Sequence, residues 1–225
     1  MNSPTLHFYF DYISPFAYFA WIRTQELSQN YDVKIQIHPV VFGKLLDHWG
    51  QLGPAEITPK REWLLKYCNR YAKLNNIELR GPKLHPFNPL PALRLSLLEV
   101  AGDRQQQVVS AIYEAGWSHG KDISSTSELI DVLTANCFSE HYLTEAMNSV
   151  DVKTALKHQT QDAINRGVFG VPTIIIDDEL FWGNDQFEHI ALYLEGEDPL
   201  DQEALTAGLA RKRGIDRKKI QSEQP

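Results

Sequence analysis

A serine stands where the first apolar segment of the chain gives way to a helical pattern. Ser14 and Pro15 follow the aromatic run Leu6–Phe10, and apolar residues recur at helical spacing from Phe16 onward. Serine is a good N-cap, and proline suits the first helical position. Because a helix N-terminus carries about half a positive charge and unpaired N–H groups, an anion such as a thiolate would be stabilised there. Capping alone would also explain this serine, and it is the commoner role.

Two further segments could hold a ligand beside that helix terminus. A cis bond between Val171 and Pro172 would turn the Val171 N–H and C=O outward toward an extended peptide ligand, although proline can simply open a strand. Ahead of the last predicted helix, N–H groups could bind a carboxylate and an acidic side chain could bind an ammonium; the plainer alternative is a helix cap. The residues concerned are Trp182, Gly183, Asn184 and Asp185.

Basic residues and one histidine supply the remaining candidates. The region from Lys44 to Arg61, which we interpret as a loop, also contains Gln51 and Lys60. Its cations could bind substrate carboxylates or simply face solvent. The eight histidines show no metal-ligand spacing, and His85 is the one placed where an inserted segment could overhang a site. The sequence therefore predicts no metal centre.

The composition describes a folded, acidic protein. The chain has 225 residues, 43% of them hydrophobic and 23% charged, with a formal net charge of −7. These values disfavour disorder and nucleic-acid binding. No apolar run approaches the roughly 20 residues of a membrane span, and the first residues lack a signal-peptide pattern. Two cysteines without a CxxC pair predict reduced thiols and a cytoplasmic protein.

The elements that must position these residues follow the order βαβ, helices, ββα. Strands at Leu6–Phe10 and Val33–His38 flank a helix, which makes them parallel. An antiparallel hairpin, Pro172–Ile176 with Leu180–Trp182, precedes the last helix. The order predicts an α/β fold, a thioredoxin-like sheet split by an all-helical insertion. The expected parts are a thioredoxin-like domain (1–57 and 167–200), a helical insertion domain (58–166) and a C-terminal tail (201–225).

Three motifs together resemble one known family. They are Phe8–Tyr18 (FYFDYISPFAY), Gly167–Thr173 (GVFGVPT) and Trp182–Asp185 (WGND). Over about residues 5–196, the chain is similar to 2-hydroxychromene-2-carboxylate isomerases and kappa-class glutathione transferases, in the DsbA-like branch of the thioredoxin superfamily. Redox members of that branch carry CxxC where this chain has Ser14–Ala17, which excludes the usual disulfide exchange.

The resemblance implies that glutathione is the cofactor and supplies the reactive thiol. Ser14 would donate to that thiol, whose pKa the helix N-terminus and the hydroxyl would lower. The Val171 backbone would pair with the glutathione cysteine beside a cis Pro172. Gln51 stands where the family usually has asparagine, and Lys60 or Arg61 would reach the glycine carboxylate. The γ-glutamyl end would lie on Trp182, Gly183, Asn184 and Asp185, with its ammonium at Asp185.

The activity implied by the resemblance is glutathione-dependent isomerisation of an aromatic ring-fission product such as 2-hydroxychromene-2-carboxylate. Thiolate addition would turn a C=C bond into a single bond, and rotation followed by elimination would give the trans product. Candidate contacts for this second substrate are Lys44 and His85. The lysine that the family uses for the substrate carboxylate aligns near Leu46, two residues from Lys44.

Two other functions fit the same motifs. One is a kappa-like glutathione transferase or peroxidase that acts on a different electrophile. The other is a non-catalytic thioredoxin-like module that binds extended peptides through the Val171 backbone. The expected partners are glutathione and a small aromatic or electrophilic substrate, with no nucleic acid and no membrane. The resemblance also allows a homodimer.

Overall fold

The computed structural model describes residues 3–214 and forms two compact units, Met1–Glu188 and His189–Pro225. All residues selected above for their chemistry belong to the first unit. The division into a thioredoxin-like domain, a helical insertion and a tail stays a prediction. The part of the predicted tail beyond residue 214 lies outside the described residues.

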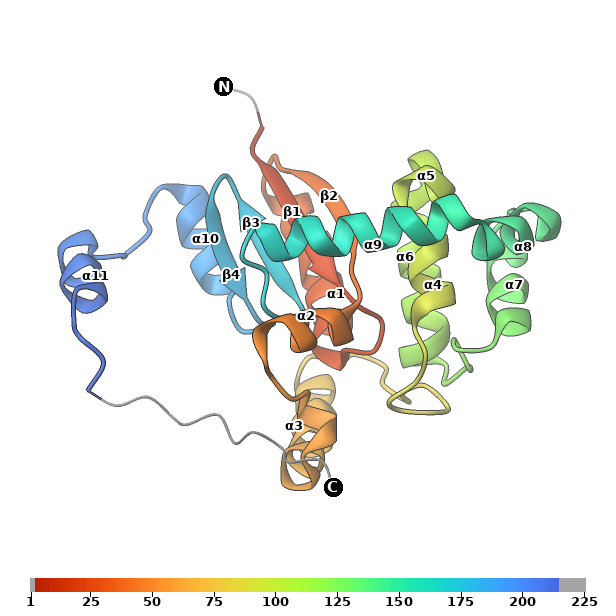
Figure 1. Ribbon diagram of the computed structural model, residues 1–225, viewed down its shortest axis with the longest axis horizontal. Helices are drawn as coiled ribbons and strands as arrows, with labels where there is room; N and C mark the ends of the chain where they lie inside the picture. The colour runs from red at the N-terminus through yellow and green to blue at the C-terminus, as the bar shows by residue number, and fades with distance from the viewer. Residues whose placement is uncertain (1–2, 215–225) are drawn as a thin grey trace, which may run out of the picture. The chain divides into compact units, whose positions relative to one another are not determined.

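A four-stranded sheet is built from the two ends of the first unit (Figure 1). Its strands are β1 (Thr5–Phe10), β2 (Lys34–Pro39), β3 (Thr173–Ile176) and β4 (Glu179–Trp182), in the order β2-β1-β3-β4. The pair β1–β2 is parallel, whereas β3 is antiparallel to both of its neighbours. This topology confirms the predicted βαβ…ββα arrangement and the thioredoxin-like fold.

Helices fill the chain between β2 and β3, as the sequence predicts. A π-helical turn, η3 (Glu114–Ser118), continues α6, and short 3₁₀ turns lie at η1 (Pro54–Glu56) and η2 (Gly102–Arg104). The α-helices are α1 (Pro15–Asn30), α2 (Phe42–Trp49), α3 (Thr58–Leu74), α4 (Leu90–Leu95), α5 (Leu98–Ala101), α6 (Gln105–Tyr113), α7 (Thr126–Ala135), α8 (Glu140–Asn148), α9 (Val150–Asn165), α10 (Phe187–Glu195) and α11 (Gln202–Leu209).

Helices α1 and α9 cover opposite faces of the sheet because the side chains of β1 alternate between two apolar sides. The Phe8 ring lies 5.4 Å from the ring of Trp21 on α1. Tyr9 belongs to a buried cluster with Ala163 and Val168, beside α9, which crosses that face in Figure 1. The strand is thus buried on both sides, and its C-terminal end is held in place where the chain turns into α1.

Helix α2 corrects one sequence interpretation. The region from Lys44 to Arg61 is not a loop: α2, η1 and the start of α3 occupy most of it. The N-cap residue of α2, Val41, makes no side-chain capping bond. Instead, the Asp11 carboxylate accepts the Phe42 N–H at 2.9 Å, from 31 positions away in sequence. A cap supplied from so far along the chain leaves no local signal in the sequence.

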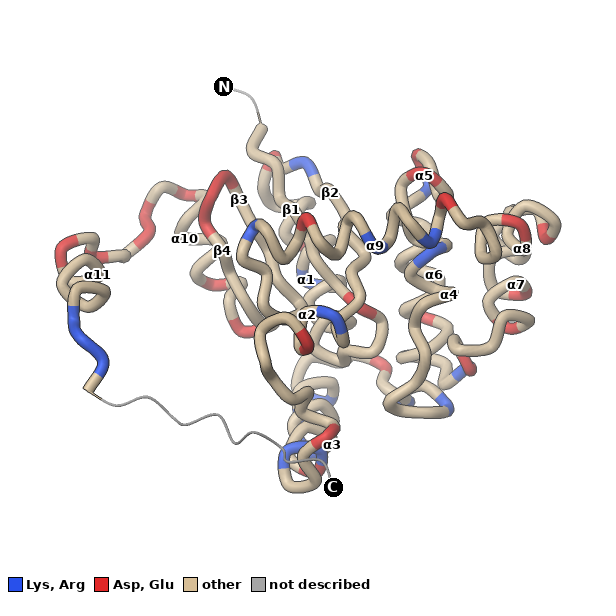
Figure 2. Tube along the Cα trace, viewed as in Figure 1, with Lys and Arg blue, Asp and Glu red and all other residues tan. Residues whose placement is uncertain are grey.

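The described part of the chain contains neither a candidate membrane-spanning helix nor a candidate metal-ligand cluster. Among residues 3–214, no helix is long and apolar enough to cross a membrane, and no three metal-ligating side chains gather in one place. Basic and acidic positions are mixed along the chain, as on α3 in Figure 2, where Lys60 and Arg61 precede Glu62.

Gly167 offers a test of the fold next to the site. It ends α9 with a φ of 81°, and its N–H bonds to the Ile164 carbonyl at 2.9 Å. Gly167→Ala should lower the free energy of unfolding by about 1 kcal/mol, because left-handed backbone disfavours a Cβ. Nothing lies within 4 Å of that added Cβ, so a clash adds nothing to this cost.

The matched control is Gly43→Ala in α2, where the new Cβ also meets nothing within 4 Å. Helical alanine is favoured over glycine, so this variant should gain roughly 0.5–1 kcal/mol. Urea unfolding of both variants measures the difference. Shifts of the same sign would contradict the assigned backbone conformation at Gly167.

Candidate active site

A cavity of about 900 Å³ lies where the start of α1, the segment from α2 to α3 and the hairpin β3–β4 come together. It unites segments far apart in the sequence: Ser14 and Val171 face each other across 157 positions. Most of the residues selected from the sequence line it. They are Ser14, Gln51, Lys60, His85, Val171, Pro172, Trp182, Gly183, Asn184 and Asp185.

Two selected cations are not among the lining residues. Lys44 points to solvent and pairs with Asp47 on the same helix, with 3.0 Å between Nζ and Oδ2. Arg61 follows Lys60 on α3 but does not contribute to the cavity wall. Its charge is still close enough to lower the pKa of the His85 imidazole. The cavity wall therefore takes its cation from Lys60.

Ser14 combines two roles that the sequence left as alternatives. Its Oγ accepts the Ala17 N–H at 3.2 Å, which makes it the N-cap of α1. The same hydroxyl donates to the Val171 carbonyl over 3.5 Å, a long contact for this type of hydrogen bond. The side chain is 8% exposed, and the peptide bond between Val171 and Pro172 is cis. The Ser14 hydroxyl therefore lies at a helix N-terminus on the cavity wall, and only a long hydrogen bond to Val171 holds its proton.

Asp11, at the end of β1, organises the two helices that flank Ser14. Its carboxylate is 1% exposed and accepts two backbone N–H groups, from Ile13 at 3.0 Å and from Phe42 at 2.9 Å. Its own carbonyl accepts the Ser14 N–H at 3.1 Å. Burial raises the pKa of Asp11 to about 7, although the two N–H bonds act in the opposite direction. Asp11 was not among the residues selected from the sequence.

Aromatic rings form much of the cavity wall. On α3, the rings of Trp63 and Tyr67 stack at 5.2 Å, and Phe16 of α1 meets Tyr67 edge-on at 5.4 Å. Across the cavity, Trp182 lies 5.1 Å from Phe169. None of these rings was selected from the sequence, and Trp63 is 56% exposed. The spacing of aromatic residues four positions apart was the available signal for this wall.

Gly170 explains why the Trp182 ring can lie close to the backbone. A Cβ built on Gly170 would come within 2.6 Å of the Trp182 Nε1, which is closer than real side chains allow. Because Gly170 has no side chain, the Trp182 indole can lie directly against its backbone, next to Val171. In this way the GVP motif shapes the wall as well as the backbone.

The end of the cavity near β4 is polar. Asn184 is 3% exposed, and neither atom of its side-chain amide has a hydrogen-bond partner within residues 3–214. Its carbonyl accepts from Arg23 of α1 at 3.1 Å, which fixes the backbone of this turn. The Asp185 carboxylate lies over Gly183 and is close enough to raise the pKa of Tyr67. Buried amides are normally paired, so Asn184 is a candidate ligand contact.

Lys60 on α3 and Asp185 after β4 place opposite charges on the cavity wall. Tyr67 lines the cavity too, and Lys60 precedes it by about 10 Å along the axis of α3, at 1.5 Å per residue. Between them the wall is apolar and aromatic. Such a groove suits an extended ligand with an ammonium at one end and a carboxylate at the other.

This sheet, its helical insertion and the pocket at the start of α1 define a thioredoxin-fold protein. The family model described as the DsbA-like thioredoxin domain matches residues 5–195, and the chain belongs to that family. Within it, the chain falls with the 2-hydroxychromene-2-carboxylate isomerases and kappa-class glutathione transferases, as the sequence motifs indicate.

Individual relatives agree with this placement. A 2-hydroxychromene-2-carboxylate isomerase of Pseudomonas putida is 30% identical over 80% of this chain and 88% of its own length. Glutathione S-transferase kappa 2 of Caenorhabditis elegans is 25% identical over 86% of this chain and 92% of its own. A solved 2-hydroxychromene-2-carboxylate isomerase superposes with a TM-score of 0.79, at 25% identity, over 92% of this chain and all of its own.

The buried Asp11 carboxyl predicts a pH dependence of stability. Its pKa rises from 3.8 to about 7 on folding, so the folded protein holds a proton that the unfolded chain has released. Stability from this group is complete at low pH and falls by about 1.4 kcal/mol per pH unit between those two values. Asp11→Asn should remove that slope. Urea unfolding at several pH values tests it, and equal slopes in both proteins would contradict the assignment.

Proposed function

We propose that this protein is a glutathione-dependent isomerase that acts on 2-hydroxychromene-2-carboxylate or a closely similar aromatic ring-fission product. Ser14 activates the glutathione thiol in this proposal. The observation that carries it is the Ser14 hydroxyl at the N-terminus of α1, which contacts the Val171 carbonyl on the wall of an aromatic cavity. None of the described residues that line this cavity is a cysteine.

The reactive thiol has to come from a ligand, because neither cysteine is suited to the role. Cys68 is buried on α3, and burial raises the pKa of its thiol to about 12. Cys137 is exposed, but it is not among the residues that line the cavity. When bound, glutathione supplies a thiolate that can add reversibly to a C=C bond and so permit its rotation.

Ser14 and α1 provide the environment for that thiolate. The N-terminal N–H groups of a 16-residue helix favour a negative charge at this point. The Ser14 hydroxyl proton now lies on a 3.5 Å contact to Val171 and can turn to a sulfur anion at little cost. Both effects lower the pKa of the ligand thiol.

The groove fits the rest of glutathione. A tripeptide in extended conformation spans about 10 Å, similar to the rise along α3 between Lys60 and Tyr67, which both line the cavity. Lys60 would take the glycine carboxylate, Asp185 the γ-glutamyl ammonium, and the unpartnered Asn184 amide its carboxylate. Gln51 and Val171 also line the cavity. The aromatic rings then leave a surface for a flat second substrate.

A kappa-like transferase acting on another electrophile is the second candidate. One observation favours it: Lys44, the expected contact of the substrate carboxylate, lies outside the cavity and pairs with Asp47. Incubation with 2-hydroxychromene-2-carboxylate and glutathione distinguishes the two functions. Turnover to an isomer of equal mass supports the isomerase, whereas a stable conjugate of higher mass supports the transferase.

Glutathione binding should be measurable as stabilisation of the fold. At 100 times its Kd, glutathione should add about 2.7 kcal/mol to the free energy of unfolding. Lys60→Gln should weaken binding by up to about fivefold, the range of an exposed ion pair. Lys44→Gln is the control, because Lys44 lies off the cavity. Equal effects of the two variants in calorimetric titration would contradict the placement of the ligand.

Removing the Ser14 hydroxyl should raise the thiol pKa of bound glutathione. A hydrogen bond to a charged group contributes about 1.5–3 kcal/mol, which corresponds to a rise of roughly 1–2 pH units. Ser14→Ala should therefore shift the thiolate ultraviolet absorbance to higher pH and reduce isomerisation at neutral pH by at least about tenfold.

The matched control for that variant is Ser149→Ala. Ser149 caps α9 through the Val152 N–H at 3.4 Å and does not line the cavity. Both variants lose a serine N-cap, at a cost of about 0.5–2 kcal/mol in stability. The thiolate titration should move only in Ser14→Ala. If it stays in place there, Ser14 is a cap and nothing more.

A further inference from the structure

His85 lies on the cavity wall, and its hydrogen bond to the backbone determines which of its two ring nitrogens carries the proton. Its Nε2 lies 2.9 Å from the carbonyl oxygen of Ile13, the residue before Ser14. A carbonyl can only accept, so Nε2 carries the proton and Nδ1 carries a lone pair in the neutral ring. No described residue donates to Nδ1. The cavity therefore contains a base whose tautomer is set by the backbone next to Ser14.

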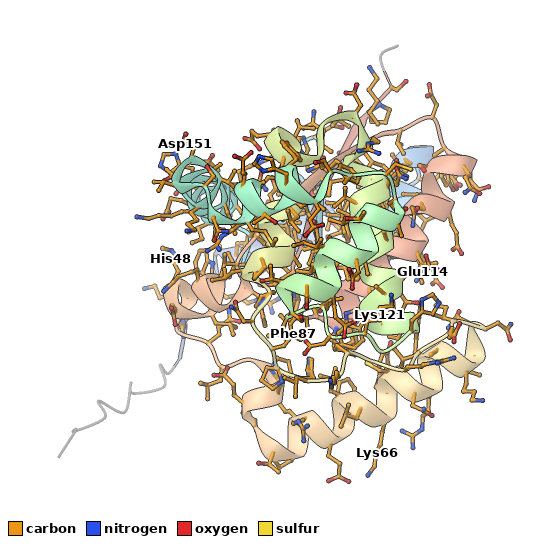
Figure 3. All side chains as sticks on the ribbon, turned by 90° about the vertical axis from the view of Figure 1, so that its right-hand side faces the viewer. His48, Lys66, Phe87, Glu114, Lys121 and Asp151 are labelled. Carbon is orange, nitrogen blue, oxygen red and sulfur yellow. The ribbon has the colours of Figure 1, made fainter. Side chains whose placement is uncertain are left out.

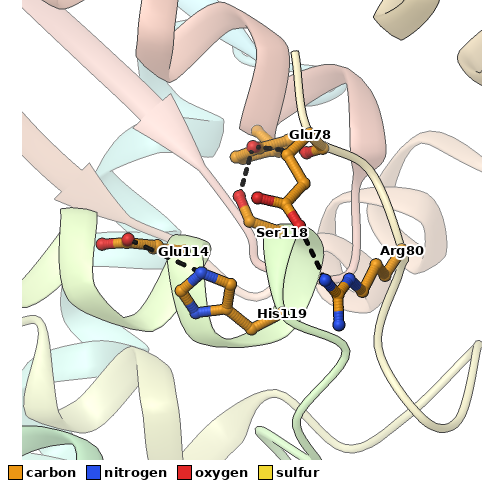
Figure 4. Close-up of polar contacts among 6 residues, drawn as sticks. Glu78, Arg80, Glu114, Ser118 and His119 are labelled. Carbon is orange, nitrogen blue, oxygen red and sulfur yellow. Dashed lines mark hydrogen bonds and ion pairs between the residues drawn. The ribbon is translucent and has the colours of Figure 1, made fainter.

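The loop that carries His85 is hydrogen-bonded to the π-helical turn η3. The N–H groups of Arg80 and Gly81 donate to the Trp117 carbonyl at 2.8 and 2.9 Å. Nearby, Tyr18 of α1 donates to the Glu78 carbonyl at 3.0 Å and bonds to Ser118 at 2.7 Å (Figure 4). Figure 3 shows the same loop, marked by Phe87, between α3 and the other helices that follow it in the chain.

The ring of His85 is also oriented from one side. It meets the indole of Trp117 edge-on at 5.7 Å, and that indole donates to the Tyr12 carbonyl at 2.9 Å. Two consecutive carbonyls before Ser14 thus hold the indole and the imidazole. These contacts hold the imidazole in a defined orientation next to Ser14, which is the geometry a positioned base requires.

The surroundings keep the imidazole neutral. Burial is the main cause that lowers the pKa of His85, the positive charge of Arg61 on α3 adds to it, and the bond to Ile13 opposes it. The Trp117 indole and the Ile13 carbonyl that contact the ring carry no net charge. At neutral pH, Nδ1 is therefore a free acceptor in a mostly apolar cavity.

We propose that His85 is the general base for a hydroxyl group of the second substrate, accepting its proton at Nδ1. This inference rests on the proposed function. In a 2-hydroxychromene-2-carboxylate, the 2-hydroxyl proton passes to Nδ1 and its O–H electron pair forms the C2=O bond. The bond between C2 and the ring oxygen breaks, and that oxygen keeps the electron pair. It then takes the proton back from His85 and becomes a phenol.

This ring opening is balanced and needs no further reactant. Its product has a C=C bond conjugated to a ketone, which is the electrophile that a thiolate at Ser14 requires. His85 and Ser14 therefore act on different atoms of the same substrate. The phenol hydroxyl that results can donate a hydrogen bond to Nδ1. His85 therefore also favours substrates with a hydroxyl attached to the aromatic ring.

Two substitutions separate a base from a structural anchor. His85→Gln places an amide N–H where Nε2 was, and so keeps a donor to Ile13, but it removes Nδ1. His85→Phe keeps a ring against Trp117 and removes both nitrogens. A general base contributes on the order of 10²-fold or more, so both variants should lose about 100-fold in kcat/KM for ring opening and isomerisation. His48→Gln, on an exposed residue of α2 labelled in Figure 3, is the control.

The pH profile provides a second readout. The change of kcat/KM with pH that is due to the imidazole should vanish in His85→Gln. The thiol pKa of bound glutathione, measured by thiolate absorbance, should remain that of the unaltered protein. If His85→Gln retains turnover within about threefold and keeps this pH dependence of kcat/KM, His85 is only an anchor and the proposal is wrong. A displaced thiol titration would equally overturn it, because His85 would then act through Ser14.

A binding test keeps the inference independent of turnover. Unreactive trans-2-hydroxycinnamate should bind the unaltered protein about three- to tenfold more tightly than 2-methoxycinnamate, the size of one net hydrogen bond. Both variants should lose this preference. If chromene turnover is absent but the preference is present and depends on His85, the isomerase proposal fails while the hydroxyl contact stands. If there is no preference, the His85 proposal fails regardless of the activity found.

Discussion

The buried carboxylate of Asp11 is the interaction on which the site depends. It lies at the end of β1, where the chain must turn into α1, and it accepts N–H groups from Ile13 and from the first turn of α2. A carboxylate removed from water needs such partners, and these two are enough to keep it in place at the expense of a raised pKa. As a result, the backbone before Ser14 and the wall formed by α2 are fixed relative to each other.

Near Asp11, the cavity has a polar site at Ser14 and, separately, polar side chains on other parts of its wall. The helix N-terminus and the Ser14 hydroxyl form a small polar site suited to an anion, while aromatic rings from α1, α3 and β4 form much of the wall around it. Low polarity strengthens the attraction between the helix terminus and a thiolate. The polar side chains on the cavity wall, Lys60 on α3 and Asn184 and Asp185 after β4, come from elements far apart in the sequence.

Local rules account for what the sequence predicted well. Ser14 caps α1, Pro15 occupies its first position, and Gly167 ends α9 in left-handed backbone, since each of these depends on the residue and its immediate neighbours. The strands were predictable because apolar runs with turn residues at their ends have few other solutions. Helix α2 was missed because the partner of its first N–H is the Asp11 carboxylate, a residue that no window around Phe42 contains.

By itself, the sequence determined the order of elements, the family and the absence of a cysteine at the start of α1. It could not decide between neighbouring cations, because the choice of Lys60 over Arg61 and Lys44 follows from the rotation of α2 and α3 about their axes. It also gave no reason to notice that one nitrogen of His85 is tied to Ile13 and the other is free. Those features arise only when packing brings separate segments together, since hydrogen-bond partners and burial are properties of the folded chain.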